Sequence, residues 1–122
     1  MDEFSIKSKD IVLQSLYPKK LVIALGEHVE FYVDANVVLR MLNLMREARH
    51  ANDDLDDQEL VVQYSEESEG SDMFCCIGFG DFRIERLTEK EFLKLEKGFA
   101  KFFKWASEYK MPFSEAFIYK IK

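Results

Sequence analysis

The stretch CCIGFGDFRIERLTEKEF, residues 75–92, contains a strand, a turn, a second strand and the start of a helix in succession. Residues 73–79 form a nearly continuous apolar run, which is typical of a buried strand. Gly80 and Asp81 then indicate a tight turn, because glycine adopts a positive φ without steric cost. Residues 82–87 follow as a second strand. The stretch therefore predicts a β-hairpin that leads directly into a helix.

The helix is predicted to begin at Thr88. Thr88 and Glu91 have the spacing of a capping box, in which each side chain satisfies a backbone amide at the helix start. Apolar residues recur with the 3.6-residue period to about Lys110, and Pro112 is expected to end the helix. The opposite side of this helix carries a row of lysines: Lys90, Lys94, Lys97, Lys101 and Lys104.

A similar order of elements recurs when the sequence is shifted by 54 residues. Gly26 then falls on Gly80 and Asp34 falls on Thr88, so the first half also reads as strand, turn, strand, cap and helix. The strand phases differ by one residue, so a β-bulge near Arg86 would be needed to keep Leu87 in the core. The shift predicts a ββα pseudo-repeat; the alternative is the hairpin-and-helix pattern common to many α+β chains. Further strands are expected at residues 10–17, 21–25, 28–33, 60–64 and 116–121, and the first helix at residues 35–50 with Asp34 as its N-cap.

These elements predict one α+β domain over residues 1–122. We expect a mostly antiparallel sheet of six to seven strands with both helices packed on one face. Residues 21–25 and 73–79 are apolar on both sides of the strand, so something must also cover the other face. A symmetric homodimer through the sheet would supply that cover.

The charge of the chain is concentrated in one segment. The formal net charge of the 122 residues is −6, and residues 52–72 contain nine acidic residues and no basic residue. Residues 52–59 and 65–72 are expected to be charged loops that steer a protein partner, which would then be basic. Duplex nucleic acid is a disfavoured partner, because neutralisation of its phosphates drives such binding.

Export and membrane insertion are not expected. No apolar run approaches the roughly 18 residues of a membrane span. The opening residues, MDEFSIKSKD, lack the apolar segment of a signal peptide. Cys75 and Cys76 are then expected to be reduced, buried thiols of a cytoplasmic protein.

Three motifs suggest chemistry but depart from the patterns that chemistry requires. Gly78-Phe79-Gly80 leads into a strand, whereas a phosphate-binding loop leads into a helix. Two cysteines and two distant histidines fall short of a convincing zinc site. NDDLDD, residues 52–57, lacks the glycine and the glutamate that a calcium loop needs at its sixth and twelfth positions. We therefore predict no cofactor, no metal and no catalytic residue from these motifs.

One strand face offers an alternative site. His28, Glu30 and Tyr32 alternate along a strand and so share one side of it. An acid, a base and a hydroxyl on an open sheet face could bind a small ligand or transfer protons. The more common structure for such a pattern is the solvated face of a half-buried strand.

The sequence favours a non-enzymatic protein-binding module that inhibits or regulates a partner, by analogy with immunity-type and phage-type inhibitors. Two alternatives stay open: a ligand-binding or enzymatic domain that uses His28, Glu30 and Tyr32, and an oligomeric structural or scaffolding protein. An exposed Trp beside charges is a common binding anchor. The candidate partner-binding residues are Asp53, Asp54, Asp56, Asp57, Glu66, Glu67, Glu69, Lys94, Lys97, Lys101 and Trp105.

Overall fold

The computed structural model describes residues 4–6, 11–16, 20–25, 29–64, 74–108 and 118–121. These residues form nine strands and two helices. The strands are β1 (Phe4–Ile6), β2 (Ile11–Leu16), β3 (Lys20–Leu25), β4 (Val29–Asp34), β5 (Leu55–Asp57), β6 (Leu60–Gln63), β7 (Phe74–Phe79), β8 (Phe82–Thr88) and β9 (Ile118–Ile121). The helices are α1 (Ala35–Ala51) and α2 (Glu89–Glu108).

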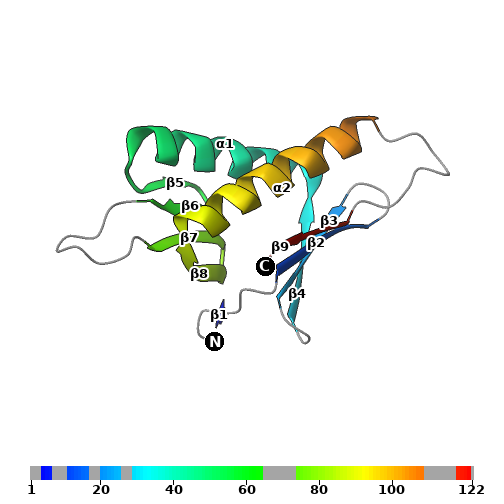
Figure 1. The fold of residues 1–122 in the computed structure, drawn as a ribbon, viewed down its shortest axis with the longest axis horizontal. Coiled ribbons are helices and arrows are strands. Elements are labelled where there is room, and N and C mark those ends of the chain that lie inside the picture. The colour runs from blue at the N-terminus through cyan, green and yellow to red at the C-terminus, as the bar shows by residue number, and fades with distance from the viewer. Residues whose placement is uncertain are drawn as a thin grey trace.

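The α+β class is confirmed, but the prediction of one sheet with six to seven strands is wrong. The strands form a five-stranded sheet in the order β1-β8-β7-β6-β5 and a four-stranded sheet in the order β4-β3-β2-β9. Two sheets form because each half of the chain pairs its own consecutive strands. Figure 1 shows the two sheets side by side below a layer that contains both helices.

The terminal strands tie the two sheets together. The first strand, β1, runs parallel to β8 in the second half, and the last strand, β9, runs antiparallel to β2 in the first half. All other strand pairs are antiparallel. Each end of the chain therefore completes the sheet that the other half builds.

Both helices span from one sheet to the other and run in opposite directions (Figure 1). The apolar stripe predicted for α1, which comprises Val38, Met41, Leu42, Met45 and Ala48, is buried along its whole length. Its counterpart on α2 includes Phe92, Phe99 and Phe102, each fully buried. Residues of both helices and of both sheets together form one continuous core.

The two sheets meet through aromatic rings. The ring of Phe31 on β4 stacks on that of Phe82 at a centroid distance of 4.3 Å and lies 5.4 Å from that of Phe79. Phe31 is only partly buried, and it packs against the core from the edge of its own sheet. Side-chain packing rather than a strand pair joins the sheets at this seam.

The hairpin of residues 74–88 matches its sequence-based prediction, including the bulge. Gly80 has φ of 64° in the turn between β7 and β8. Cys75 pairs with Leu87 and Ile77 pairs with Ile84, so one residue of β7 lies opposite two of β8. Arg86 is one of the two β8 residues at the bulge, and its φ is 59°. The bulge changes the phase of the strand, and Leu87 is buried as predicted.

The capping predictions have different outcomes at the two helices. Thr88 Oγ1 accepts a hydrogen bond from the Glu91 amide at 3.1 Å, and Glu91 Oε1 accepts one from the Thr88 amide at 2.9 Å. The capping box is confirmed. Asp34 occupies the N-cap position of α1, but within the described chain its carboxylate makes no capping hydrogen bond. The backbone there is extended, as an N-cap requires, and the predicted side-chain contact is wrong.

The first acidic segment, residues 52–59, is not a simple loop as predicted, because it contains β5 and the turn into β6.

The predicted correspondence at a shift of 54 residues holds for β3 with β7 and for the starts of α1 and α2. The predicted turns near Pro18 and Gly26, the second acidic loop at 65–72, and the end of the second helix after Glu108 lie outside the described residues.

Candidate functional site

The side of α2 that faces away from the core carries only lysines as charged residues between positions 90 and 104. We call this surface the lysine face; it comprises Lys90, Lys94, Lys97, Lys101 and Lys104. All are exposed except Lys94, which is half-buried. At 1.5 Å per residue the row is about 21 Å long. It is a straight, positively charged ridge on a protein whose formal charge is −6.

The two acidic residues in this part of α2 point elsewhere and are buried. Glu91 belongs to the capping box. Glu96 is 9% exposed, and its carboxylate accepts two hydrogen bonds from the guanidinium of Arg49 on α1, at 2.9 and 2.8 Å. Arg46 Nε lies 3.6 Å from the same carboxylate. Glu96 therefore joins the two helices to each other, and its carboxylate is not part of the lysine face.

The helix that carries the lysine face lies unusually close to the four-stranded sheet. A Cβ added at Gly98 would lie 2.6 Å from Leu13 Cδ1 and 2.8 Å from Tyr119 Cδ1. Lys101 Nζ lies 5.4 Å from the centroid of the Tyr119 ring, where a cation–π interaction steadies its side chain. The face is thus held by a helix whose position is set by close packing.

The apolar residues beside the lysine face differ in exposure. Trp105, a candidate binding anchor from the sequence, is half-buried and stacks on Phe102 at a centroid distance of 5.9 Å. Leu93 is instead 41% exposed at the other margin of the face. Leu93 is therefore more accessible to a partner than Trp105, whose side chain is partly covered by the fold.

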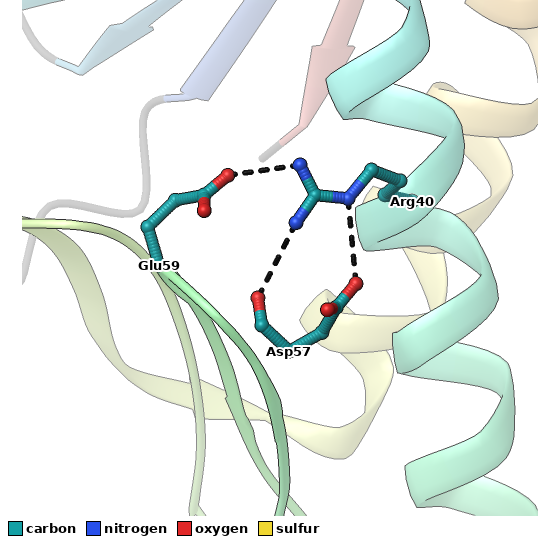
Figure 2. Close-up of polar contacts among 3 residues, drawn as sticks. All are labelled: Arg40, Asp57 and Glu59. Atoms are coloured by element: carbon teal, nitrogen blue, oxygen red, sulfur yellow. Dashed lines mark hydrogen bonds and ion pairs between the residues drawn. The ribbon is translucent and has the colours of Figure 1, made fainter.

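Two residues of the first acidic segment hold α1 against the β5–β6 hairpin (Figure 2). Arg40 donates from Nε to Asp57 Oδ2 at 3.3 Å, from Nη2 to the Asp57 carbonyl at 3.4 Å, and from Nη1 to Glu59 Oε1 at 2.9 Å. A hydrogen bond from its own backbone amide, followed by the bond from Arg40, lowers the pKa of Glu59. Asp57 is therefore a structural residue, although the sequence placed it among the partner-binding acids.

Asp54 also has a structural contact. Its Oδ1 accepts a hydrogen bond from the backbone amide of Tyr64 at 2.9 Å, while its own amide donates to Asp53 Oδ1 at 2.8 Å. Asp53, in the turn after α1, and Asp56, in β5, are exposed. The acids Glu66, Glu67 and Glu69 lie outside the described residues. Asp53 and Asp54 thus lie in the turn after α1, and Asp56 lies in β5.

A buried polar cluster lies under the start of α2. The Tyr64 hydroxyl donates to Glu89 Oε2, and the Tyr64 ring packs on Phe92 at 4.8 Å. Burial, followed by the hydrogen bond to Glu89, raises the pKa of Tyr64. Cys75 and Cys76 are buried thiols, and burial raises the pKa of Cys75 to about 12. Within the described ranges, no three His, Cys, Asp or Glu residues cluster as metal ligands would.

The described residues of the alternative site on β4, Glu30 and Tyr32, are exposed. Tyr32 donates from its hydroxyl to Glu30 Oε1 at 3.2 Å, and this bond raises the pKa of Tyr32. His28 lies outside the described residues. A hollow of about 240 Å³ opens at the seam of the two sheets, where Tyr32, Asp34 and Glu59 contribute to its wall. Glu30 is not among its lining residues, so the acid and the hydroxyl do not converge in that hollow.

The chain matches no protein-family model, and no curated protein or solved structure matches it significantly. Neither α1 nor α2 combines the length and apolarity that a membrane-crossing helix needs. The surfaces of the molecule are therefore what indicate its function.

Proposed function

We propose that this chain is a cytoplasmic, non-enzymatic protein-binding module that regulates or inhibits an acidic protein by docking through the lysine face of α2. The observation that supports the proposal is the row of five lysines over about 21 Å, with no carboxylate between them on that side of the helix. Such a row gives a strong local potential that speeds encounter with a surface of opposite charge.

The packing of α2 suits it to this role. Its inner side is held by fully buried phenylalanines and by the close approach of Gly98 to the sheet. The surface that a partner meets is therefore preorganised. No loop of this surface has to become ordered on binding, which reduces the entropic cost of association. Leu93 at the margin adds an apolar contact that contributes to affinity once the charges have oriented the partner.

The first acidic segment is the weaker candidate for the main contact. Asp54 and Asp57 are already engaged within the fold. Asp53 and Asp56 are exposed, and neither is engaged by Arg40 or by the Tyr64 amide. We propose that they act as a secondary electrostatic surface, which orients the molecule by giving it an acidic end and a basic side.

A protein is favoured over nucleic acid as the partner. The lysine face alone would suit phosphates, but the chain as a whole carries a formal charge of −6 and would repel a long polyanion beyond the local contact. A folded acidic protein presents its negative charge over a surface of limited size. The net repulsion is then smaller, and the local attraction dominates.

The proposal is tested with two variants altered at the same three positions, Lys97, Lys101 and Lys104. One carries Glu at all three, and the control carries Arg, which keeps the charge. Each chain is used to capture proteins from its native host after nuclease treatment, and the captured partner is then measured against each purified chain. We expect an acidic protein to bind the wild type and the Arg variant, and the Glu variant to associate at least about tenfold more slowly at low salt.

Equal binding of that protein by the Glu and Arg variants would contradict docking through the lysine face. Nuclease-sensitive capture, or tighter binding of a single-stranded or duplex oligonucleotide than of any captured protein, would instead assign the face to nucleic acid. Circular dichroism of each variant checks that α2 is intact.

A further inference from the structure

The outward face of the four-stranded sheet has two regular rows of side chains that cross all four strands. The strand register aligns Tyr32 with Val22, Val22 with Gln14, and Gln14 with Ile118. It likewise aligns Glu30 with Ala24, Ala24 with Val12, and Val12 with Lys120. These eight side chains point away from the helices, because the alternate positions of the same strands are buried in the core.

Apolar side chains are left exposed at both margins of this face. Tyr32 on the edge strand β4 is 57% exposed, and Ile118 on the opposite edge strand β9 is 56% exposed. They are two of the three large apolar residues that are exposed in the described chain, the third being Leu93 on α2. Val22, in the same row as these two, is only 8% exposed, and Val12 and Ala24 in the second row are half-buried. The face is thus more apolar than a sheet surface that only meets water.

The second row has opposite charges at its two ends. Glu30 lies at the β4 end and Lys120 at the β9 end, with Ala24 and Val12 between them. Three strand spacings of about 4.8 Å separate the charges by about 14 Å, which is too far for an ion pair within one chain. This row has an acid at one end, a base at the other and apolar groups between them. It is therefore complementary to the same row of a second copy that is rotated by 180°.

We propose that a second copy of this chain packs on this face, with a two-fold axis that runs parallel to the strands between β2 and β3. That axis sets Glu30 opposite Lys120 of the second copy and Lys120 opposite Glu30 of the second copy. It also brings Tyr32 over Ile118 of the second copy and Ala24 over Val12 of the second copy. Every charged end of the row then meets its opposite, and the exposed apolar groups are covered.

The dimer is expected to be weak and dependent on concentration. Eight side chains line the face, whereas a standard stable interface uses about 20–30 residues on each side. We expect a dissociation constant between about 10 µM and 1 mM. The lysine face belongs to α2, which packs on the opposite side of the sheet from this outward face, so the dimer would leave both lysine faces open. The inference is therefore independent of the proposed function.

Charge reversal at the two ends of the row tests the geometry. Sedimentation equilibrium is measured at low salt for the wild type, Glu30→Lys, Lys120→Glu and the variant that carries both changes. Each single variant sets two like-charged pairs against each other in the dimer, and we expect its dissociation constant to rise roughly tenfold. The double variant exchanges the charges and should return to within about threefold of the wild type.

The Glu variant at Lys97, Lys101 and Lys104 is the matched control and should dimerise like the wild type. Ile118→Asp offers a second disruption that does not depend on the charge pairs, and it should leave the chain monomeric. A wild type that is monomeric at about 1 mM would overturn the proposal. A double variant as weak as either single variant would also overturn it, as would single variants that dimerise like the wild type.

Discussion

Thr88 and Asp34 hold equivalent positions at the starts of the two helices, yet only one of them caps with its side chain. Thr88 exchanges two hydrogen bonds with Glu91, which lies three residues further on. Position 37 in α1, which corresponds to Glu91, is a valine, and the first turn of α1 contains no acidic residue. The reciprocal half of the box is therefore missing at Asp34.

This difference predicts unequal costs for two similar substitutions. Thr88→Ala should lower the free energy of unfolding by about 1 kcal/mol, because the backbone amide of Glu91 loses the Thr88 hydroxyl that accepts its hydrogen bond. Asp34→Ala should change it by less than about 0.5 kcal/mol, because no capping bond is lost. Urea unfolding of both variants measures the difference. Equal losses would mean that the Asp34 carboxylate caps α1 in solution.

Cys75 links burial to the stability of the protein at alkaline pH. The pKa of this thiol is raised from 9.0 to about 12 because burial disfavours the thiolate, with the nearby Glu89 as the second cause. Between these two values the folded chain holds a proton that the unfolded chain has lost. The contribution to stability is complete below about pH 9 and is lost as pH rises toward 12.

The expected result is a free energy of unfolding that falls between about pH 9 and about pH 11, and falls less steeply in Cys75→Ala. Tyr64 acts in the same direction, since its pKa is also raised, so the variant should keep part of the slope. Urea unfolding at a series of pH values gives both slopes. Parallel slopes for the two proteins would show that Cys75 does not titrate in this way.

Gly98 decides how closely α2 approaches the four-stranded sheet. Glycine lowers intrinsic helix stability, so a sequence pattern alone would favour alanine at this position. The neighbours Leu13 and Tyr119 come within 2.6 and 2.8 Å of where an alanine Cβ would lie. Leu13 is fully buried, so its side chain can move away only by displacing its neighbours in the core. The glycine is required by packing.

Gly98→Ala should therefore destabilise the protein by about 1–2 kcal/mol, although it improves helix propensity by about 1 kcal/mol. Lys97→Ala on the exposed side of the same turn is the control, and its effect should stay within about 0.5 kcal/mol. Thermal or urea unfolding measures both. A Gly98→Ala variant that is more stable than the wild type would place α2 further from the sheet than the structure does.

The hairpin that precedes α2 is an element whose details follow from its own residues. Gly80 meets the need for a positive φ in the turn. The mismatch in apolar phase between residues 82–84 and Leu87 required an extra residue, and Arg86 supplies it with a φ of 59°. The turn and the bulge are both determined by residues close to them in the sequence, so local patterns were enough to predict them.

Across the whole molecule, charge is distributed over separate surfaces. The lysine face lies on the outside of α2, and the acids Asp53 and Asp56 lie in the turn after α1 and in β5. The outward face of the four-stranded sheet has Glu30 and Lys120 at opposite ends of one row. Because these surfaces are separate, each set of variants serves as a control for the other. Loss of partner binding with an unchanged dimer, or the converse, distinguishes the two proposals.

The local sequence was sufficient for both helices, for most strands and for the faces that they bury, but it did not indicate β1 or β5. Capping, turn chemistry and apolar periodicity act over a few residues, and they predicted the hairpin, the bulge, the buried stripes of both helices and the row of lysines. The division into two sheets was not predictable in this way. It depends on which strands pair, and β1 with β8 and β9 with β2 join positions at opposite ends of the chain.

The roles of single charged residues likewise depended on distant contacts. Asp57 and Asp53 look alike in the sequence, but only Asp57 lies within reach of Arg40, which is 17 residues away. Glu30 and Lys120 share a row only because β9 returns to pair with β2. Packing between elements sets such distances, and no local pattern encodes them. The residue types that could bind a partner were therefore readable in the sequence, whereas the surfaces they form arose from the way in which the two halves pack.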